Sequence, residues 1–417
     1  MKISADSLHT TFQIHLPASK SISNRVLTIN ALSENPDMPQ NLADCDDTKV
    51  MLEWLTARPS AINIGAAGTA MRFSTALLAV TTGTYVITGS QRMKQRPIAV
   101  LADSLNSLGA QIEYLENEGF PPLKIHGNPM MQGGELSLRG DVSSQYISAL
   151  LMVAPMMSNG LTIHLEGNII SRSYIDMTIG VMREFGAVVS WKSQDTIRVE
   201  HGIYKARPYF VEADWSASSY WYEILALSDS IDCIFLDGLF DESLQGDAEV
   251  ASIFSQLGIV TDFIQTEEGK MTARIYKEET GIDFFSYDFV NQPDLAQTLV
   301  VTCCMMGIPF RFTGLSTLRI KETDRISALQ TELAKLGYDI KEENGSELSW
   351  DGSRRDLSEE EFRQVAIDTY DDHRMAMAFA PCCLKMGPLT INHPEVVSKS
   401  YPGFWLDLQS AGFQLNF

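Results

Sequence analysis

The chain has 417 residues, 45% hydrophobic and 20% charged, which is the composition of a folded globular protein too long for one ordinary core. Its 53 acidic and 32 basic residues give a net charge of −21, which excludes nucleic acid and anionic membranes as general partners because the summed field repels both. An anionic ligand therefore has to be bound locally, where arginine and lysine side chains converge with the N–H groups of helix N-termini.

Targeting signals and metal sites are not expected from this sequence. No apolar run reaches the length of a membrane span, and residues 1–12 lack the features of a signal or transit peptide, so we expect a cytoplasmic protein. The six cysteines include no Cys-x-x-Cys pair and show no ligand-like spacing with the seven histidines. We therefore expect reduced cysteines in the core and no metal.

One pattern recurs along the chain: a small or charged residue, an amphipathic helix, a short polar or glycine-containing turn and an alternating strand. From the second copy onward it returns about every 75 residues, which indicates internal repeats. The expected helices start near Lys20, Gly68, Ser143, Asp214, Asp294 and His373. The strands expected after them include 84–88, 161–165, 231–236, 310–313 and 389–391.

A second helix recurs on the same period and ends in an apolar residue followed by glycine, as a left-handed helix C-cap requires. These glycines are Gly109, Gly186, Gly258, Gly337 and Gly412. Six copies in two groups of three predict two similar α/β domains. We place the boundary within residues 203–214 and expect the N-terminal strand to pair with the second half of the chain.

The first half of the chain offers two loops that lead into helices. Residues 17–21, Pro-Ala-Ser-Lys-Ser, are followed by Arg25 on the same helix face as Ser21. Lys20, Ser21 and Arg25 can bind one phosphate, although this short match alone favours a capping serine beside solvated charges. Residues 65–72, Gly-Ala-Ala-Gly-Thr-Ala-Met-Arg, place small side chains where the backbone approaches either a ligand or a packed strand.

Two further helix starts carry hydroxyl groups. Ser143, Ser144 and Gln145 can hydrogen-bond a phosphate or a polyhydroxylated ligand, or simply cap the helix. Ser171 and Tyr174 can reach a sugar-like ring, or lie in an ordinary surface loop.

Dense charged clusters occur at 92–97, 321–325 and 371–374, where the last two read Lys-Glu-Thr-Asp-Arg and Asp-Asp-His-Arg. Such clusters indicate acid/base chemistry beside an anion site. Asp294 precedes an apolar helix, as its N-cap or as a base, and His373 is expected to orient or transfer a proton. The cations interpreted as a polyanion site are Arg92, Arg96, Lys321, Arg325, Arg374 and Lys399.

Taken in order, residues 17–25, 65–72, 92–97, 143–145, 321–325 and 372–377 resemble the 5-enolpyruvylshikimate-3-phosphate synthase family. The resemblance implies a two-domain inverted α/β barrel-like fold with six βαβαββ repeats, three per domain. The implied domains are 19–212, and 1–18 together with 213–417, with the active site in the interdomain cleft.

The resemblance also implies an activity in the shikimate pathway, the transfer of the enolpyruvyl group of phosphoenolpyruvate to the 5-hydroxyl of shikimate 3-phosphate. No metal or organic cofactor is implied. The expected partners are these two small molecules, and we expect a monomer.

Roles of individual residues follow from the same resemblance. Asp294 is implied to accept the proton of the attacking hydroxyl, and Glu322, helped by Lys321, to protonate the methylene carbon. The implied catalytic residues are Asp294, Glu322, Lys321, Lys20 and His373. Those implied for shikimate 3-phosphate are Lys20, Ser21, Arg25, Ser143, Ser144, Gln145, Ser171, Tyr174, Asp294, Thr317 and Lys321. Those implied for phosphoenolpyruvate are Lys20, Gly68, Arg96, Gln145, Arg325, Arg374 and Lys399.

The sequence departs from the family pattern at Ala66 and Thr317, where asparagine is usual, and at Phe73, where proline is usual. From Ala66 and Thr317 we expect a polar contact on the shikimate side to be lost or altered, whereas Phe73 lies on the helix beside the implied phosphoenolpyruvate site and leaves sensitivity to glyphosate-type inhibitors open. Two alternatives stay open. A related transferase acting on UDP-N-acetylglucosamine is disfavoured because the first half has only Cys45, ahead of the 65–72 motif. A ligand-binding paralogue without activity is disfavoured because the acid/base residues Asp294, Lys321 and Glu322 are all present.

Overall fold

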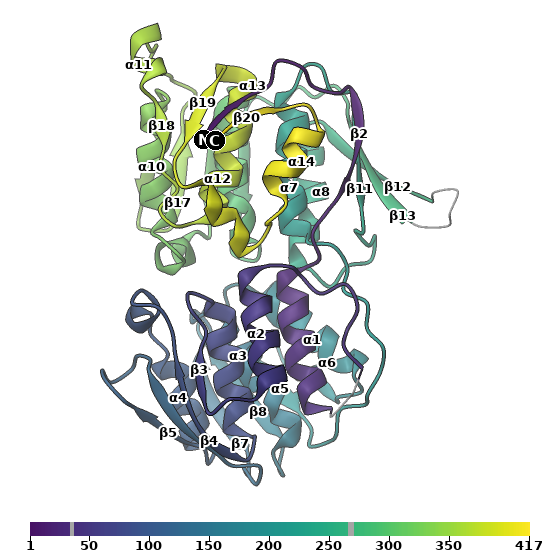
Figure 1. The fold of residues 1–417 in the computed structure, drawn as a ribbon, viewed down its shortest axis with the longest axis vertical. Coiled ribbons are helices and arrows are strands. Elements are labelled where there is room, and N and C mark those ends of the chain that lie inside the picture. The colour runs from purple at the N-terminus through teal and green to yellow at the C-terminus, as the bar shows by residue number, and fades with distance from the viewer. Residues whose placement is uncertain (34–36, 266–270) are drawn as a thin grey trace. The chain divides into compact units, whose positions relative to one another are not determined.

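The computed structural model describes residues 1–33, 37–265 and 271–417 (Figure 1). The chain divides into two compact units. Ala18–Glu212 forms one, called here the continuous unit, and Met1–Pro17 with Ala213–Phe417 forms the other, called here the split unit. Within the described residues, no helix combines the length and the apolar character needed to span a membrane.

Within its described residues, the continuous unit contains two four-stranded sheets and six α-helices. Its helices are α1 (Lys20–Leu32), α2 (Asp46–Ala57), α3 (Gly68–Ala79), α4 (Ala99–Ser107), α5 (Ser144–Val153) and α6 (Arg172–Glu184), with short 3-10 helices η1 (Met93–Gln95) and η2 (Ala154–Met156). One sheet has the order β3 (Ala61–Asn63), β4 (Gly83–Thr88), β6 (Leu123–Gly127) and β5 (Gln111–Tyr114). The other has the order β7 (Gly134–Arg139), β8 (Leu161–Glu166), β10 (Thr196–Val199) and β9 (Val189–Trp191).

The split unit contains three four-stranded sheets. Their orders are β12 (Ile259–Gln265), β13 (Met271–Lys277), β11 (Cys233–Asp237), β2 (Thr11–His15); β14 (Phe285–Asp288), β15 (Phe310–Thr313), β17 (Glu347–Trp350), β16 (Lys341–Glu343); and β18 (Ala366–Ile367), β19 (Leu389–Ile391), β1 (Lys2–Ser4), β20 (Gln414–Asn416). The α-helices are α7 (Trp215–Leu227), α8 (Val250–Ser255), α9 (Ala296–Met306), α10 (Arg325–Lys335), α11 (Glu359–Arg363), α12 (His373–Phe379), α13 (Cys383–Met386) and α14 (Phe404–Ser410). The 3-10 helices are η3 (Gly246–Glu249), η4 (Pro293–Leu295), η5 (Ser316–Ile320), η6 (Ala380–Cys382) and η7 (Pro394–Lys399).

All five sheets are built in the same way. One edge strand pairs in parallel with its neighbour, as β3 does with β4, and the other two pairings are antiparallel. In the three sheets whose four strands follow one another in the chain, one helix connects the parallel strands and a second helix follows them, which makes a βαβαββ repeat. In the other two sheets, one strand comes from the N-terminus. This confirms the expected mixed α/β fold. The first copy is reduced, because α1 and α2 are accompanied only by an isolated bridge between Gln40 and Phe210.

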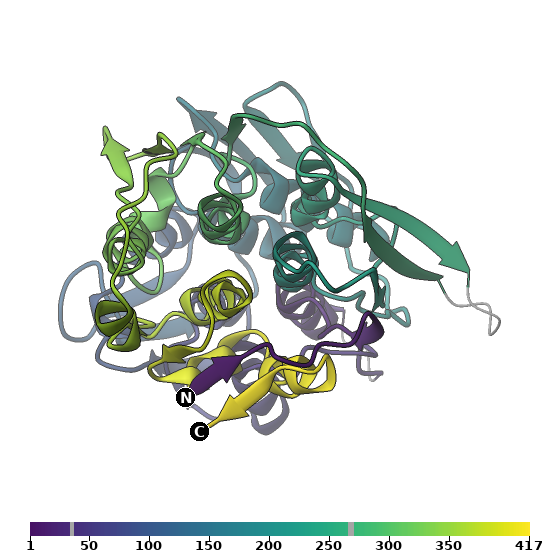
Figure 2. The same ribbon diagram turned by 90° about the horizontal axis from the view of Figure 1, so that it is seen from above.

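The N-terminal residues complete two sheets of the split unit. Strand β2 pairs in parallel with β11, and β1 lies between β19 and β20 (Figure 2). The prediction that the N-terminal strand pairs with the second half of the chain is therefore confirmed.

The predicted helix C-caps are also confirmed. The five glycines have positive φ angles of 106, 83, 82, 92 and 101°, which glycine adopts without a steric penalty. In the first copy, α2 ends instead at Arg58, with a φ of 47°. All six cysteines are free; five are buried and Cys233 is partly exposed.

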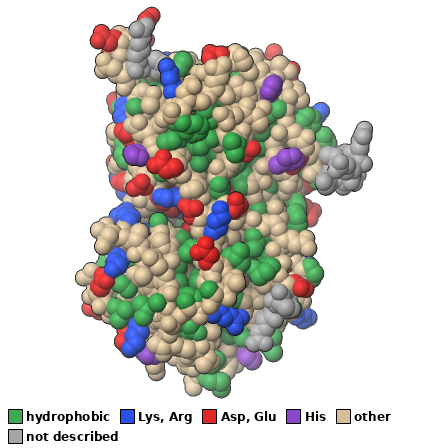
Figure 3. Space-filling model, viewed as in Figure 1, with side chains coloured by type: hydrophobic (Ala, Val, Ile, Leu, Met, Phe, Trp, Pro, Cys, Tyr) green, Lys and Arg blue, Asp and Glu red, His purple; other side chains and the backbone are tan. Residues whose placement is uncertain are grey.

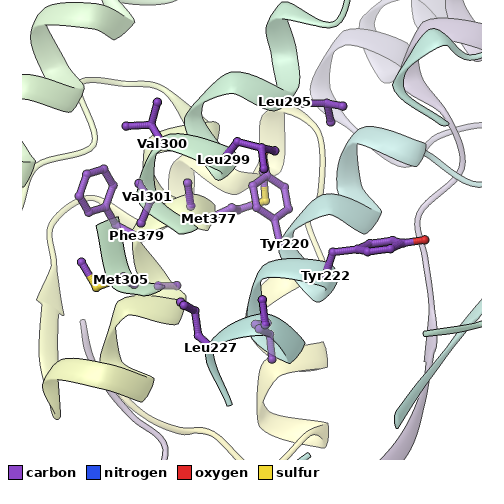
Figure 4. Packing of buried hydrophobic residues seen from close by; sticks show 14 of the residues in the cluster. Tyr220, Tyr222, Leu227, Leu295, Leu299, Val300, Val301, Met305, Met377 and Phe379 are labelled. Atoms are coloured by element: carbon purple, nitrogen blue, oxygen red, sulfur yellow. The ribbon is translucent and has the colours of Figure 1, made fainter. Parts of the chain in front are cut away.

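Inner helices form the core of each unit. In α3, α7 and α12 every residue is buried, including charged ones such as Arg72, Glu223 and Arg374. Helices α1, α3 and α5 pack against one another, and so do α7, α9 and α12. Figure 4 shows Tyr220 of α7, Leu299 of α9 and Met377 of α12 meeting in the core of the split unit. This packing holds the first turns of the inner helices in fixed positions. At the surface, acidic and basic side chains are interspersed on the face drawn in Figure 3.

Candidate functional site

In the continuous unit, two guanidinium groups lie over the first residue of α3. Arg72 Nη1 donates to the Gly68 carbonyl oxygen at 2.9 Å. A Cβ at position 68 would lie 2.7 Å from Arg96 Nη1 and 2.9 Å from Arg72 Nη1, so only glycine lets both groups lie there. A helix N-terminus carries partial positive charge, and two arginines add to it. This arrangement favours an anion.

The start of α5 joins this cluster. Gln145 Nε2 donates to Thr69 Oγ1 at 3.1 Å, and the Tyr146 ring lies 5.6 Å from the Arg72 guanidinium. The structure therefore brings together Gly68, Arg96 and Gln145, which the resemblance assigned to phosphoenolpyruvate. Arg72 belongs to the same cluster, although the sequence pattern gave it no role.

Arg25 forms a second feature of this unit. It is only 2% exposed, and its hydrogen bonds go to Thr178 Oγ1 at 2.7 Å, Ser148 Oγ at 3.3 Å and the carbonyl oxygens of Ser21 at 2.9 Å and Tyr174 at 3.1 Å. Burial lowers the pKa of Arg25 to about 10. Among the described residues its hydrogen-bond acceptors are all neutral, so the surroundings of this cation favour an added anion.

The departure at Phe73 lies directly beside Arg25. The Arg25 guanidinium is 5.4 Å from the centroid of the buried Phe73 ring, a distance suited to a cation–π contact. The ring thus supplies a further uncharged partner for the cation.

The remaining predicted residues of this unit lie at helix starts. Ser143 caps α5 by accepting from the Gln145 N–H at 3.4 Å, and Ser144 follows it. Ser171 precedes α6 with a φ of 54°, a left-handed conformation that costs a non-glycine residue about 1–3 kcal/mol and is frequent at functional sites. Lys20 opens α1 near Cys45, where its charge partly offsets the rise in the thiol pKa that burial causes.

The split unit contains a denser cluster centred on Arg325, the first residue of α10. Its Nε is 2.7 Å from Asp372 Oδ2, its Nη1 is 3.0 Å from Asp294 Oδ1, and its Nη2 is 2.9 Å from Glu322 Oε2. Burial alone would lower the pKa of Arg325, but the negative charges of Asp372, Glu322 and Asp294 raise it above its usual value. Three of the predicted residues are therefore in direct contact here.

Asp294 is in turn surrounded by cations. Besides Arg325, Lys321 Nζ lies 3.3 Å from Oδ1 and Arg374 Nη2 lies 3.0 Å from Oδ2. The cap residues of η4 and α9 are Gln292 and Leu295, so the interpretation of Asp294 as a helix N-cap is wrong. Its carboxylate instead joins the starts of α9, α10 and α12.

Arg374 also contacts the start of α7. Its Nη2 is 3.4 Å from Ser216 Oγ and its Nη1 is 3.4 Å from Tyr220 Oη. Ser216 donates to the buried Asp247 at 2.5 Å. Burial, and then the charge of Asp294, raise the pKa of Asp247 to about 6. A buried carboxyl group with a raised pKa therefore contacts Ser216, which is a neighbour of Arg374.

The segment before α12 is unusual. Tyr370 and Asp371 both have positive φ angles, 53 and 54°. Asp372 then caps α12, accepting from the Arg374 N–H at 2.9 Å, and Lys399 Nζ donates to the Asp371 carbonyl oxygen. His373 is 2% exposed, with Nδ1 3.7 Å from Asp372 Oδ1.

Thr317 lies apart from these contacts. Its hydroxyl oxygen is inaccessible to solvent and has no hydrogen-bond partner among the described residues.

Sequence reasoning missed Ser216, Tyr220 and Asp247. The first two lie in the first turns of α7, whose predicted start at Asp214 corresponds by repeat to the starts at Lys20 and Gly68. That correspondence was a usable signal for them. Asp247 stands in a short polar segment without periodicity, so its burial could not be read from the sequence.

Within residues 1–33, 37–265 and 271–417, no three His, Cys, Asp or Glu side chains are grouped so that they could hold a metal ion.

Comparison with known proteins identifies relatives over nearly the whole chain. The model of the family EPSP synthase (3-phosphoshikimate 1-carboxyvinyltransferase) matches residues 55–408. A 3-phosphoshikimate 1-carboxyvinyltransferase of Bacteroides fragilis is 54% identical over 403 residues, covering 97% of this chain and 96% of the relative. One of Sulfurovum sp. is 35% identical over 430 residues, covering 95% and 96%.

A solved structure of EPSP synthase from Acinetobacter baumannii has the same fold, with a TM-score of 0.78 at 21% identity, covering 100% of this chain and 99% of that one. The family match extends over most of the chain and includes the residues of the Arg325 cluster. The chain therefore belongs to the EPSP synthase (3-phosphoshikimate 1-carboxyvinyltransferase) family.

Proposed function

We propose that this protein transfers the enolpyruvyl group of phosphoenolpyruvate to the 5-hydroxyl of shikimate 3-phosphate, giving 5-enolpyruvylshikimate 3-phosphate and phosphate. The observation that carries the proposal is the Asp294 cluster, in which one carboxylate contacts Lys321, Arg325 and Arg374. Family membership supports it, since the relatives at 54% and 35% identity bear this activity in their names.

The reaction needs a base at the attacking oxygen and an acid at the methylene carbon. Asp294 takes the proton of the 5-hydroxyl as its oxygen bonds to the central carbon of phosphoenolpyruvate. Glu322, with Lys321 beside it, donates a proton to the methylene carbon, which becomes a methyl group. In the second step the bond to the phosphate oxygen breaks, phosphate leaves, and the methyl group returns its proton. Lys20 and His373 are assigned supporting roles in these proton transfers.

Substrate binding is divided between the two clusters. Arg325, Arg374 and Lys399 hold phosphoenolpyruvate from the split unit, and the paired guanidinium groups suit its carboxylate. The residues assigned to phosphoenolpyruvate in the continuous unit are Lys20, Gly68, Arg96 and Gln145, with Arg72 now added. Those assigned to shikimate 3-phosphate are Lys20, Ser21, Arg25, Ser143, Ser144, Gln145, Ser171, Tyr174, Asp294, Thr317 and Lys321.

The ion pairs of Asp294 give the base a way to respond to substrate. Three cations around a carboxylate weaken its affinity for a proton. Phosphoenolpyruvate brings a carboxylate and a phosphate that compete for Arg325 and Arg374. As these arginines turn toward the substrate, Asp294 loses positive charge around it and becomes a stronger base. The base is thus activated only when its substrate is bound.

Part of the proposal comes from the resemblance alone. We keep the expectations that both clusters serve one active site, that the protein is a monomer and that it is cytoplasmic.

The test is phosphate release by the purified protein with phosphoenolpyruvate and shikimate 3-phosphate. Release that depends on shikimate 3-phosphate and collapses in Asp294→Asn supports the proposal. Release with UDP-N-acetylglucosamine instead would favour the related transferase. Binding of shikimate 3-phosphate without release from either acceptor would favour a paralogue without activity.

A further inference from the structure

Helix α10 carries two buried charged side chains, two turns apart on one face. Arg325 at its start is 1% exposed and Glu332 is 0% exposed. Residues seven apart face the same side of a helix, and Ala328 and Leu329 fill the space between them. Arg325 belongs to the site described above. Glu332 has no assigned part in it.

The contacts of Glu332 reach out of its own helix. Oε1 accepts from the Tyr370 hydroxyl at 2.5 Å, and Oε2 accepts from the Asp368 N–H at 3.1 Å. Lys335 Nζ lies 2.7 Å from Oε2 and also 2.8 Å from Asp368 Oδ2. Both carboxylate oxygens therefore hold the segment that runs from β18 to α12.

The segment between β18 and α12 contains a backbone conformation that its surroundings must stabilise. Tyr370 and Asp371 are consecutive left-handed residues, and neither is glycine. An L side chain in this conformation is disfavoured, so it persists where the surroundings fix it. Glu332 supplies this restraint at Asp368, two residues before the strained pair, and at Tyr370, the first residue of the pair. Asn392 Nδ2 adds another, donating to Asp368 Oδ1 at 2.7 Å.

The strained pair sets the position of the site residues that follow. The Asp372 N–H donates to the Thr369 carbonyl oxygen at 2.8 Å, which closes the turn. Asp372 then contacts Arg325 at 2.7 Å and caps the helix that carries Arg374, while the Asp371 carbonyl oxygen accepts from Lys399. Helix α10 thus grips one short segment at two points, through Glu332 and through Arg325.

We propose that Glu332 is a positioning residue for phosphoenolpyruvate binding. By anchoring Asp368 and Tyr370, it fixes the left-handed turn that sets Arg374 and Lys399. This inference rests on the proposed function. The simpler alternative is a helix-stabilising ion pair between Glu332 and Lys335. Such a pair explains one oxygen of Glu332, but not the hydroxyl of Tyr370 or the N–H of Asp368.

Three variants of the full-length protein separate these explanations. Glu332→Gln keeps the shape but weakens the anchor, and Tyr370→Phe removes one hydrogen bond from an exposed residue. Leu333→Ala is the matched control, since Leu333 is 0% exposed in the same helix and its truncation creates a cavity without removing a side-chain hydrogen bond. For each, we would measure kcat, the KM of both substrates, urea unfolding and amide hydrogen exchange of residues 368–374.

We expect Glu332→Gln to raise the KM for phosphoenolpyruvate about tenfold, with a smaller change for shikimate 3-phosphate, and Tyr370→Phe to act in the same direction, about threefold. Both variants should speed exchange in residues 368–374, whereas Leu333→Ala should lower stability and leave the ratio of the two KM values unchanged.

A Glu332→Gln variant that loses stability as Leu333→Ala does, with KM values and local exchange unchanged, would overturn the proposal. If Glu332→Gln does not fold, an unchanged KM and unchanged exchange in Tyr370→Phe would overturn it equally. Failure of the proposed function is a separate result: the wild-type protein would then release no phosphate, while the exchange data still report on the turn.

Discussion

Two arginines, one in each unit, are equally buried but held in opposite ways. Arg25 contacts only neutral oxygens and the face of Phe73 among the described residues, whereas Arg325 contacts three carboxylates. Burial lowers the pKa of the first to about 10, and neighbouring carboxylates raise that of the second. In the continuous unit the described partners of the buried cation are thus neutral, whereas in the split unit the buried cation is balanced by carboxylates.

The largest effect is expected at Asp294, the residue proposed to accept the proton of the attacking hydroxyl. Asp294→Asn keeps the size of the side chain and a hydrogen-bonding oxygen, but an amide does not act as a base. We expect the rate of phosphate release to fall about 10²–10⁴-fold. Binding of phosphoenolpyruvate, measured by calorimetry, should be unchanged or tighter, because a competitor for Arg325 and Arg374 has been weakened. A kcat within threefold of the wild type would remove Asp294 from its role.

The two buried arginines can be compared directly by substitution. Arg325→Met leaves three carboxylates without their shared cation, and breaking a buried ion pair in this way costs about 3–5 kcal/mol. Arg25→Met leaves neutral oxygens unpaired, which costs about 1–3 kcal/mol. Urea unfolding of both variants measures the difference. Equal losses would show that the contrast in their partners has no energetic consequence.

The raised pKa of Asp247, which lies beside the cluster around Asp294, predicts that the free energy of unfolding depends on pH. Its pKa is raised to about 6 in the native state, against about 3.9 in an unfolded chain. Between these values the native state binds a proton that the unfolded state has released, so the contribution of Asp247 to stability falls as pH rises. Relative to the wild type, Asp247→Asn should gain about 3 kcal/mol of unfolding free energy between pH 4 and 7. A difference that stays constant across this range would contradict the raised pKa.

The smallest effect is expected at Gly68, beside Arg72 and Arg96 in the continuous unit. In Gly68→Ala the new Cβ would lie 2.7 to 2.9 Å from the ends of Arg96 and Arg72, which are flexible and can shift. We expect the KM for phosphoenolpyruvate to rise about tenfold with kcat nearly unchanged. Gly202→Ala is the matched control, since a Cβ there meets no described atom within 4 Å. A fall in kcat alone would place Gly68 in the chemical step instead.

The same contrast explains what the sequence could predict. Repeats, helix starts and glycine C-caps depend on residues close together in the chain, so their periodicity predicts them. The partners of Arg325 lie 31 residues before it and 47 after it, at Asp294 and Asp372, and no local pattern encodes that meeting. The motifs therefore predicted candidate site residues, but not that one arginine contacts three carboxylates.

The burial of charged side chains was the second feature that the sequence could not predict. Glu332 and Lys335 are spaced as an ordinary surface ion pair on a helix, yet Glu332 is completely buried. Whether a helix face meets solvent or a returning segment depends on the packing of β18 and the turn after it, which lie more than 30 residues away. The burial of Glu332 can therefore be recognised only in the folded structure.

The pairing of β1 and β2 determines when two sheets of the split unit can form during synthesis. During translation, residues 1–17 emerge first, but β2 finds its neighbour only after β11 is made, and β1 only after β19 and β20. The whole of Ala18–Glu212 leaves the ribosome in the interval. The continuous unit can therefore fold before β1 and β2 have sheets to join. The split unit can complete its sheets only later, with strands that were synthesised before the rest of that unit.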